Sequence, residues 1–237
     1  MMTYQEIYDK CVPVAKRNTD KLNVWLYYVV RPLSVVTTKP LLNTRIMPTT
    51  VTALSMITTL IGFILVSFAP TLGWRIAGWF GFFLWALLDC VDGNIARCKE
   101  QCSKRGELWD AAGGYLALSL VFFSSGIAGF NEEATFRLWP AEWNIILGGL
   151  TALLSIYPRL IAQKKRAISD AHEVLSVMDK RNFSLPRIIA MNIESAIGFM
   201  QVLFLFSIIF QLSNVFIGFY FLVNLAIALV SMKDLLA

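Results

Sequence analysis

Long apolar runs, separated by short polar stretches, dominate the chain from residue 47 onward. Each run is close to the roughly 20 residues that an α-helix needs to cross a bilayer. The predicted spans cover residues 47–69, 73–97, 106–130, 141–163, 187–210 and 213–232. Polar connections lie at 98–105, 131–140 and 164–186. The pattern therefore predicts an all-α integral membrane protein with six transmembrane helices.

The beginning of the chain does not follow this pattern. Residues 1–22 are polar and basic, and the apolar segment 24–36 is interrupted by Arg31 and Pro32. A segment this short favours an amphipathic helix at the membrane interface, with an additional spanning helix as the alternative. We predict an interfacial, cytoplasmic N-terminal segment at 1–46 and a six-helix membrane domain at 47–237.

Composition and charge support a membrane protein and suggest its orientation. Hydrophobic residues make up 57% of the chain and charged residues 16%, which is too apolar for a typical soluble domain. The net charge of +5 is better explained by topology and by anionic lipids or phosphates than by nucleic acid. With a cytoplasmic N-terminus, only Arg75 and Arg137 of the 21 lysines and arginines face outward. We therefore expect a multi-pass protein with both termini and the active site cytoplasmic, in the cell membrane if the source is prokaryotic.

Two carboxylates and two small residues share one face of the predicted helix 73–97. Taking Asp89 as zero, Asp92 lies at about 300°, Gly93 at about 40° and Ala96 at about 340° around the helix. Carboxylates are costly inside a membrane and usually mark an ion or substrate site there. Small residues on the same face let a ligand or another backbone come close.

The neighbouring charged residues extend this candidate site. Asp110, on the next apolar segment, is positioned to supply a third carboxylate from a facing helix. Oxygen ligands of this kind suit a hard cation such as Mg²⁺, which often also holds phosphate oxygens. Arg97, at the polar end of its helix, suits a phosphate or a diphosphate.

Residues 89–110 resemble the signature of the CDP-alcohol phosphotransferase family. The residues in register with that signature are Asp89, Asp92, Gly93, Ala96, Arg97, Gly106 and Asp110. The chain departs from it at Gly114, which stands where the family has a fourth aspartate, its proposed general base. The resemblance extends over essentially the whole membrane region, and it also implies a homodimer.

The resemblance implies a reaction in phospholipid or related phosphodiester synthesis. A substituted phosphoryl group, such as phosphatidyl, would pass from a CDP-linked alcohol donor to an acceptor hydroxyl, releasing CMP. Asp89, Asp92 and Asp110 would hold Mg²⁺ or Mn²⁺ on the donor diphosphate. Nucleotide binding would involve Asp89, Asp92, Gly93, Ala96, Arg97 and Gly106.

The missing fourth aspartate leaves three possibilities: another base, an acceptor that needs none, or binding without efficient turnover. Glu194 is the first candidate for a substitute base, because it is predicted to lie about 10 Å inside the fifth helix from Arg187. Glu107 is the weaker candidate, on nearly the same face as Gly114 but about 10.5 Å away along the helix.

Two arginines at predicted cytoplasmic helix ends, Arg159 and Arg187, are candidates for binding an acceptor or lipid phosphate. Their alternative role is to set topology by their charge. The main alternative function is a non-catalytic or inactivated membrane protein that binds CDP-alcohols or lipids. A transporter is disfavoured because the charges gather at one face of the membrane.

Overall fold

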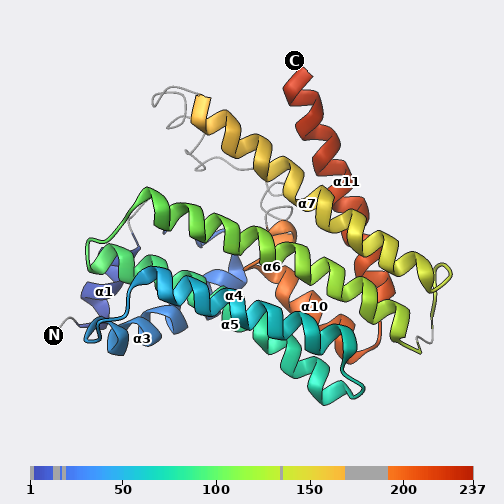
Figure 1. Ribbon diagram of the computed structural model, residues 1–237, viewed down its shortest axis with the longest axis horizontal. Coiled ribbons are helices and arrows are strands. Elements are labelled where there is room, and N and C mark those ends of the chain that lie inside the picture. Colours follow the sequence, from blue (N-terminus) through green and yellow to red (C-terminus); the bar gives the residue numbers. More distant parts are fainter. Residues whose placement is uncertain (1–2, 13–16, 18–19, 134–135, 169–191, 237) are drawn as a thin grey trace. The chain divides into compact units, whose positions relative to one another are not determined.

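The structure, a computed structural model, describes residues 3–12, 17, 20–133, 136–168 and 192–236 (Figure 1). In this part of the chain every regular element is helical, which confirms the all-α fold. The chain divides into two compact units. Unit 1 comprises Met1–Gly62, Trp79–Ala117 and Ser184–Val202, and unit 2 comprises Phe63–Gly78, Leu118–Phe183 and Leu203–Ala237.

The N-terminal segment forms three short helical elements: α1 (Tyr4–Cys11), the π-helix η1 (Leu26–Val30) and α3 (Arg31–Leu42). Pro32 accounts for the π-helical turn, because it has no N–H to donate and its ring widens the preceding turn. Helix α1 packs on α3 through a buried cluster that contains Ile7 and Val35. None of these three elements is long and apolar enough to span a membrane.

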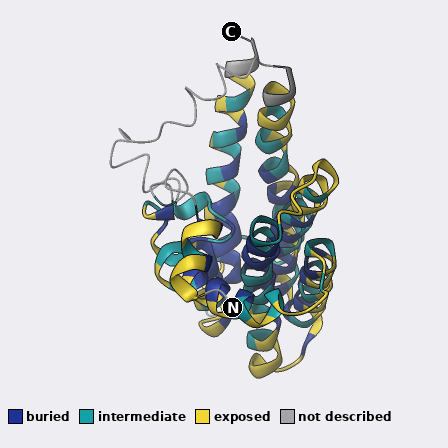
Figure 2. Ribbon diagram, turned by 90° about the vertical axis from the view of Figure 1, so that its left-hand side faces the viewer, coloured by how far each residue is buried: buried dark blue, intermediate teal, exposed yellow. Residues whose placement is uncertain are grey.

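Five described helices are long and apolar enough to cross a membrane. They are α4 (Pro48–Phe68), α5 (Leu72–Cys98), α6 (Lys104–Asn131), α7 (Glu142–Ile168) and α11 (Ser213–Leu236). Each corresponds closely to a predicted span. Along the same helices, buried positions lie beside exposed ones, and many of the exposed residues are large and apolar (Figure 2). An apolar exposed surface is expected of helices that face lipid.

The predicted span 187–210 differs from the others. Its first five residues lie outside the described part of the chain, and its later residues form the short apolar helix α10 (Phe199–Ile209). Between them, a helical stretch at 192–194 is followed by a turn at 196–198. Glu194 therefore ends a helical stretch, whereas the sequence predicts it inside a continuous helix.

Polar side chains explain this interruption. Asn192 accepts a hydrogen bond from the backbone N–H of Val24 at 3.0 Å. Ser195 Oγ accepts another from Asn23 Nδ2 at 2.7 Å. Asparagine and serine side chains that bind outside their own helix compete with helical hydrogen bonding. The turn thereby ties residues 192–195 to the N-terminal segment.

Small and apolar residues bring the helices of unit 1 together. A Cβ atom at Gly81 of α5 would lie 2.8 Å from the carbonyl oxygen of Thr58 in α4, so the two backbones are in close contact. Val51, Val91 and Ile95 form a buried cluster between the same helices. The start of α4 and the end of α5 are therefore held side by side, and this arrangement positions the acidic face of α5.

Unit 2 is built on α7 and α11, which pack along each other (Figure 1). Glycines allow the second half of α6 to approach α7, because a Cβ at Gly148 would lie 3.0 Å from the Cα of Gly126. Phe122, Phe216 and Tyr220 add aromatic contacts in the interior of this unit.

Candidate active site

One pocket in unit 1 is lined by all seven residues that match the signature. It has a volume of about 750 Å³, within the usual range for ligand sites. The signature residues that line it are Asp89, Asp92, Gly93, Ala96, Arg97, Gly106 and Asp110. Other walls come from the start of α4, from the connection between α5 and α6, and from the N-terminal segment. The residues that match the signature along the sequence therefore lie together in the fold.

Asp92 is held in a fixed orientation by α4. Its side chain is 4% exposed, and the Thr52 hydroxyl donates a hydrogen bond to Asp92 Oδ2 at 2.5 Å. A hydrogen bond to an ionised oxygen is among the stronger ones in proteins. Thr52 therefore fixes the orientation of the Asp92 carboxylate in the wall of the pocket.

Arg97 is positioned by a chain of hydrogen bonds that begins in α3. Asn94 Nδ2 donates to the hydroxyls of Ser34 and Thr38, each at 3.2 Å. The amide oxygen of Asn94 then accepts a hydrogen bond from Arg97 Nη2 at 3.0 Å. A Cβ at Gly93 would lie 3.1 Å from Arg97 Nη1, so the small residue leaves room for the guanidinium. The N-terminal segment thus helps to orient the signature arginine.

The connection between α5 and α6 is anchored by two lysines. Lys10 Nζ donates to the carbonyl oxygen of Cys98 at 3.1 Å and forms an ion pair with Glu100 at 3.0 Å. Lys99 Nζ donates to the carbonyl oxygen of Thr44 at 2.8 Å. These contacts hold the turn that brings the end of α5 to the start of α6.

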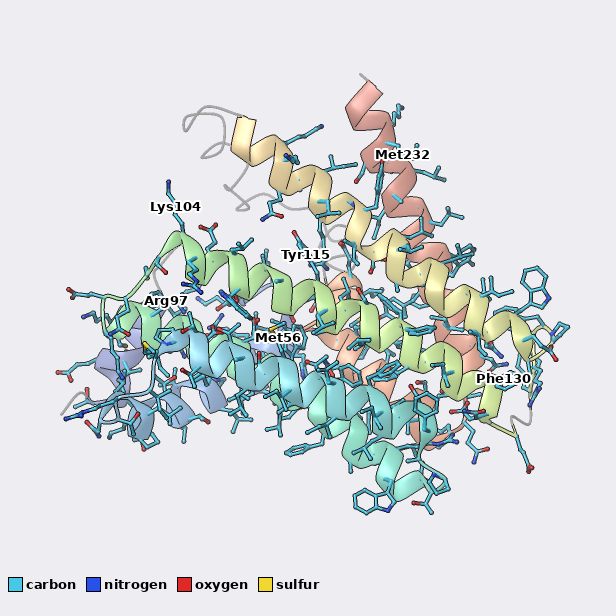
Figure 3. The ribbon with its side chains drawn as sticks, viewed as in Figure 1. Met56, Arg97, Lys104, Tyr115, Phe130 and Met232 are labelled. Carbon is cyan, nitrogen blue, oxygen red and sulfur yellow. The ribbon has the colours of Figure 1, made fainter. Side chains whose placement is uncertain are left out.

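Ser103 precedes α6 and caps its first turn. Its hydroxyl accepts a hydrogen bond from the N–H of Gly106 at 3.0 Å, which is the usual contact of an N-cap residue. Figure 3 shows Arg97 and Lys104 at the neighbouring ends of the two helices. Both residues line the pocket, so this end of the helix pair supplies two of the three basic residues among its described lining residues.

The charges around the pocket favour a divalent cation. The described lining residues include the acids Asp20, Asp89, Asp92, Glu107 and Asp110, and the bases Arg31, Arg97 and Lys104. Negative charge is therefore in excess by two, and Asp92 and Asp110 are close enough to repel each other. Carboxylate oxygens are suitable ligands for Mg²⁺. In the described part of the chain, however, no three acidic, histidine or cysteine side chains already converge on one point.

The other predicted site residues fall in different places. Glu107 lines the pocket, whereas Glu194 is not among its described lining residues. A Cβ at Gly114 would have no other heavy atom within 4 Å among the described residues. Arg159 lies in unit 2, and Arg187 lies outside the described residues.

Several residues of the site were not predicted from the sequence, among them Asp20, Arg31, Thr52 and Asn94. Thr52 carries a weak signal, since it lies one helical turn after Pro48 in the first predicted span. Arg31 is recognisable only as an interruption of an apolar segment. Their roles depend on contacts between segments far apart in the chain, which spacing alone does not reveal.

Comparison with known proteins identifies the family of the chain. The family model described as CDP-alcohol phosphatidyltransferase matches residues 45–230. The chain therefore belongs to the CDP-alcohol phosphatidyltransferase family. It is also similar to cholinephosphotransferase 1 of Bos taurus, with 38% identity over 80 residues. That match covers 31% of this chain and 18% of the relative, so it spans less than a fifth of the relative's length.

Proposed function

We propose that the protein transfers a substituted phosphoryl group from a CDP-linked alcohol to an acceptor hydroxyl, releasing CMP. The observation that carries the proposal is that all seven matching signature residues line one pocket. To bind a CDP-alcohol, a family member would need these residues in one pocket. The volume, the carboxylates and the arginine suit a nucleotide diphosphate with its cation.

Each residue type has a definite task in this reaction. Asp89, Asp92 and Asp110 would hold Mg²⁺ or Mn²⁺, and Arg97 would contact the donor diphosphate. The chemistry that such a cation supplies when bound is neutralisation of negative charge on the diphosphate and on the departing CMP. The acceptor oxygen would form a bond to the donor phosphorus distal to cytidine, while the bond from that phosphorus to the CMP oxygen breaks.

The proton of the acceptor hydroxyl needs a base, and we propose Glu107 for that role. Glu107 lines the pocket, one helical turn before Asp110. Glu194, at the end of its helical stretch, is not among the described lining residues and becomes the second candidate. General-base assistance usually contributes about 10²–10⁴-fold to the rate.

The substrates and surroundings follow from the family and from the relative. The relative's name makes a CDP-choline type of donor the first to test, with a lipid alcohol as acceptor. We propose that residues 1–46 lie at the cytoplasmic interface, that 47–237 form the membrane domain, and that two copies assemble as a homodimer. The positive charges at the ends of α5 and α6 support a pocket that opens to the cytoplasm. We propose Arg159 and Arg187 as further contacts to an acceptor or lipid phosphate.

The test is CMP release by the purified protein in lipid micelles containing Mg²⁺. CDP-choline, CDP-ethanolamine and CDP-diacylglycerol would be tested with a panel of acceptor alcohols. We expect at least one pair of substrates to release CMP, and we expect Glu107→Gln to lower kcat by about a hundredfold or more. Glu133→Gln is the matched control, because Glu133 is exposed and lies in unit 2. Full activity of Glu107→Gln would eliminate Glu107 as the base.

Gly114 is the specific observation that favours a second function, binding without turnover. The position lacks the carboxylate that serves the family as base. A protein with this function would bind CDP-alcohols in the presence of Mg²⁺, and no acceptor would stimulate CMP release. Calorimetric binding of CDP-choline together with inactivity towards every acceptor would therefore support the binding function over the transferase.

A further inference from the structure

A buried ion pair from the N-terminal segment forms part of the pocket wall. Arg31 donates hydrogen bonds from Nε to Asp20 Oδ2 at 2.8 Å, and its Nη2 lies 2.8 Å from the same oxygen. The two side chains are only 3% and 5% exposed, and both residues line the pocket. The carboxylate holds one edge of the guanidinium and thereby fixes its plane.

The rest of this guanidinium is not satisfied by the protein. Arg31 Nη1 is buried and has no hydrogen-bond partner among the residues that the structure describes. Arg97 Nε, in the same pocket, is also buried and has none in that part of the chain. Leaving such a donor unpaired is unfavourable, more so when it carries charge. Two arginines that line one pocket thus each carry a buried donor without a partner in the described part of the chain.

Stability does not explain why such a pair would be buried here. The cost of removing two charges from water often exceeds their attraction, so a buried ion pair is weak evidence for a stabilising role. The unsatisfied Nη1 adds a further cost. A ligand with anionic oxygens would supply the missing acceptor, and the planar guanidinium suits phosphate in particular.

We propose that Arg31, oriented by Asp20, binds a phosphate oxygen of the ligand in this pocket as a second arginine beside Arg97. The N-terminal segment then contributes directly to substrate binding as well as to membrane contact. This inference rests on the proposed function, under which the pocket receives a phosphate-bearing ligand. The phosphate belongs either to the nucleotide diphosphate or to a phosphorylated acceptor, and the two sources are distinguishable by binding.

The experiment compares Arg31→Ala, Arg31→Lys and Asp20→Asn with the wild type by calorimetry in Mg²⁺. The probes are CDP, CMP, cytidine and sn-glycerol 3-phosphate. The matched controls are Arg17→Ala and Asp9→Asn, which break a more exposed ion pair of the same segment. Neither control residue is among the described lining residues of the pocket.

We expect Arg31→Ala to weaken binding of a phosphate-bearing probe by about ten- to a hundredfold, as for loss of a charged hydrogen bond. Arg31→Ala should leave the affinity for cytidine unchanged. The two control variants should leave the affinity for every probe unchanged. A loss confined to CDP and CMP assigns Arg31 to the donor, and a loss confined to sn-glycerol 3-phosphate assigns it to the acceptor. Asp20→Asn should cause a smaller loss of affinity for the same probe.

Arg31→Lys is included in case Arg31→Ala fails to fold. It retains the positive charge, but its single nitrogen has to serve both Asp20 and the ligand. This variant should keep the wild-type unfolding temperature and should bind the same probe more weakly. Unchanged affinity of folded Arg31→Lys and Arg31→Ala for every phosphate-bearing probe would overturn the inference. Failure of the proposed transfer reaction would appear separately, as absence of CMP release in the wild type despite Arg31-dependent CDP binding.

Discussion

Each unit has an arginine beside a buried carboxylate, but the two pairs differ in how fully they are hydrogen-bonded. In unit 2, Glu132 accepts hydrogen bonds from the Ser213 hydroxyl at 2.6 Å and from the Ser213 N–H at 3.1 Å. Arg75 Nη1 lies 3.7 Å from the same carboxylate. In unit 1, Arg31 and Asp20 form a pair that leaves Arg31 Nη1 without a partner in the described part of the chain.

This difference separates a structural network from a ligand site. Glu132 joins the end of α6 to the first residue of α11, and its oxygens are used within the protein. Such a satisfied buried network stabilises one arrangement of helices. The pocket of unit 1 instead contains excess negative charge and unsatisfied donors, which a cation and an anionic ligand would complete. Mutations in the two units should therefore affect different properties.

The largest expected effect is loss of activity from Asp92→Asn. The substitution removes a proposed metal-binding charge, and the contribution of a catalytic metal is several kcal/mol, or about a thousandfold in rate. Folding stability should be retained, because the variant also relieves repulsion with Asp110. CMP release and unfolding temperature would be measured with Asp9→Asn as the exposed control. Calorimetry showing equal nucleotide affinity with Mg²⁺ and with EDTA would contradict the metal role.

The opposite pattern is expected for Glu132→Ala. Removing the buried Glu132 carboxylate leaves the Ser213 hydroxyl and N–H without their acceptor and removes the charge beside Arg75, at a cost of about 3 kcal/mol in the free energy of unfolding. Nucleotide affinity of the folded protein should be unchanged. Denaturant unfolding in micelles measures the loss, and Glu133→Ala is the exposed neighbouring control. Equal stability of the two variants would show that the network is not structural.

Thr52→Val tests the support of the pocket. The variant keeps the shape of Thr52 and removes the hydroxyl that donates to Asp92. Loss of a hydrogen bond to a metal ligand typically costs about 10–100-fold in metal affinity or activity. We expect a higher Mg²⁺ concentration for half-maximal CMP release, with little change in unfolding temperature. Thr37→Val is the control, since Thr37 is half-buried and is not among the described pocket-lining residues.

The Glu132 network of unit 2 should also make the stability of the protein depend on pH. Burial raises the pKa of Glu132 above the usual value of 4.5. The folded state then binds this proton more tightly than the unfolded chain does, so its contribution to stability is complete below pH 4.5. It declines as the pH rises through the raised pKa, by at most about 1.4 kcal/mol per pH unit. Unfolding curves measured upward from pH 4 should show this decline in the wild type and not in Glu132→Gln.

The smallest effect is expected from Gly114→Asp. A side chain has space at this position, because a Cβ would have no other heavy atom within 4 Å among the described residues. If the chain is a weakened family member, the new carboxylate should raise CMP release by about tenfold. If Glu107 has taken over as base, the change should be neutral or inhibitory while Glu107→Gln lowers activity. Neutral results for both variants would favour an acceptor that needs no base.

Much of the membrane fold was predictable because apolar length is a local property. The described helices α4, α5, α6, α7 and α11 each match a predicted span. The prediction of a continuous helix around Glu194 was wrong. The helix is interrupted where Asn192 accepts a hydrogen bond from the N–H of Val24 and Ser195 accepts one from Asn23 Nδ2. Such contacts join positions about 170 apart in the chain, where periodicity carries no information.

The family and the acidic face of α5 could be recognised from residue types at fixed spacing along the chain, and the membrane class from the length of the apolar runs. Which other residues complete the site became clear from the packing of the helices. Asp92 is oriented by Thr52, and Arg97 by Asn94 through α3. Glu107 lines the pocket and Glu194 is not among its described lining residues, although both are acids of equal chemistry. Hydrogen bonds and desolvation act over a few ångströms in space, so their partners emerge only once the helices have packed.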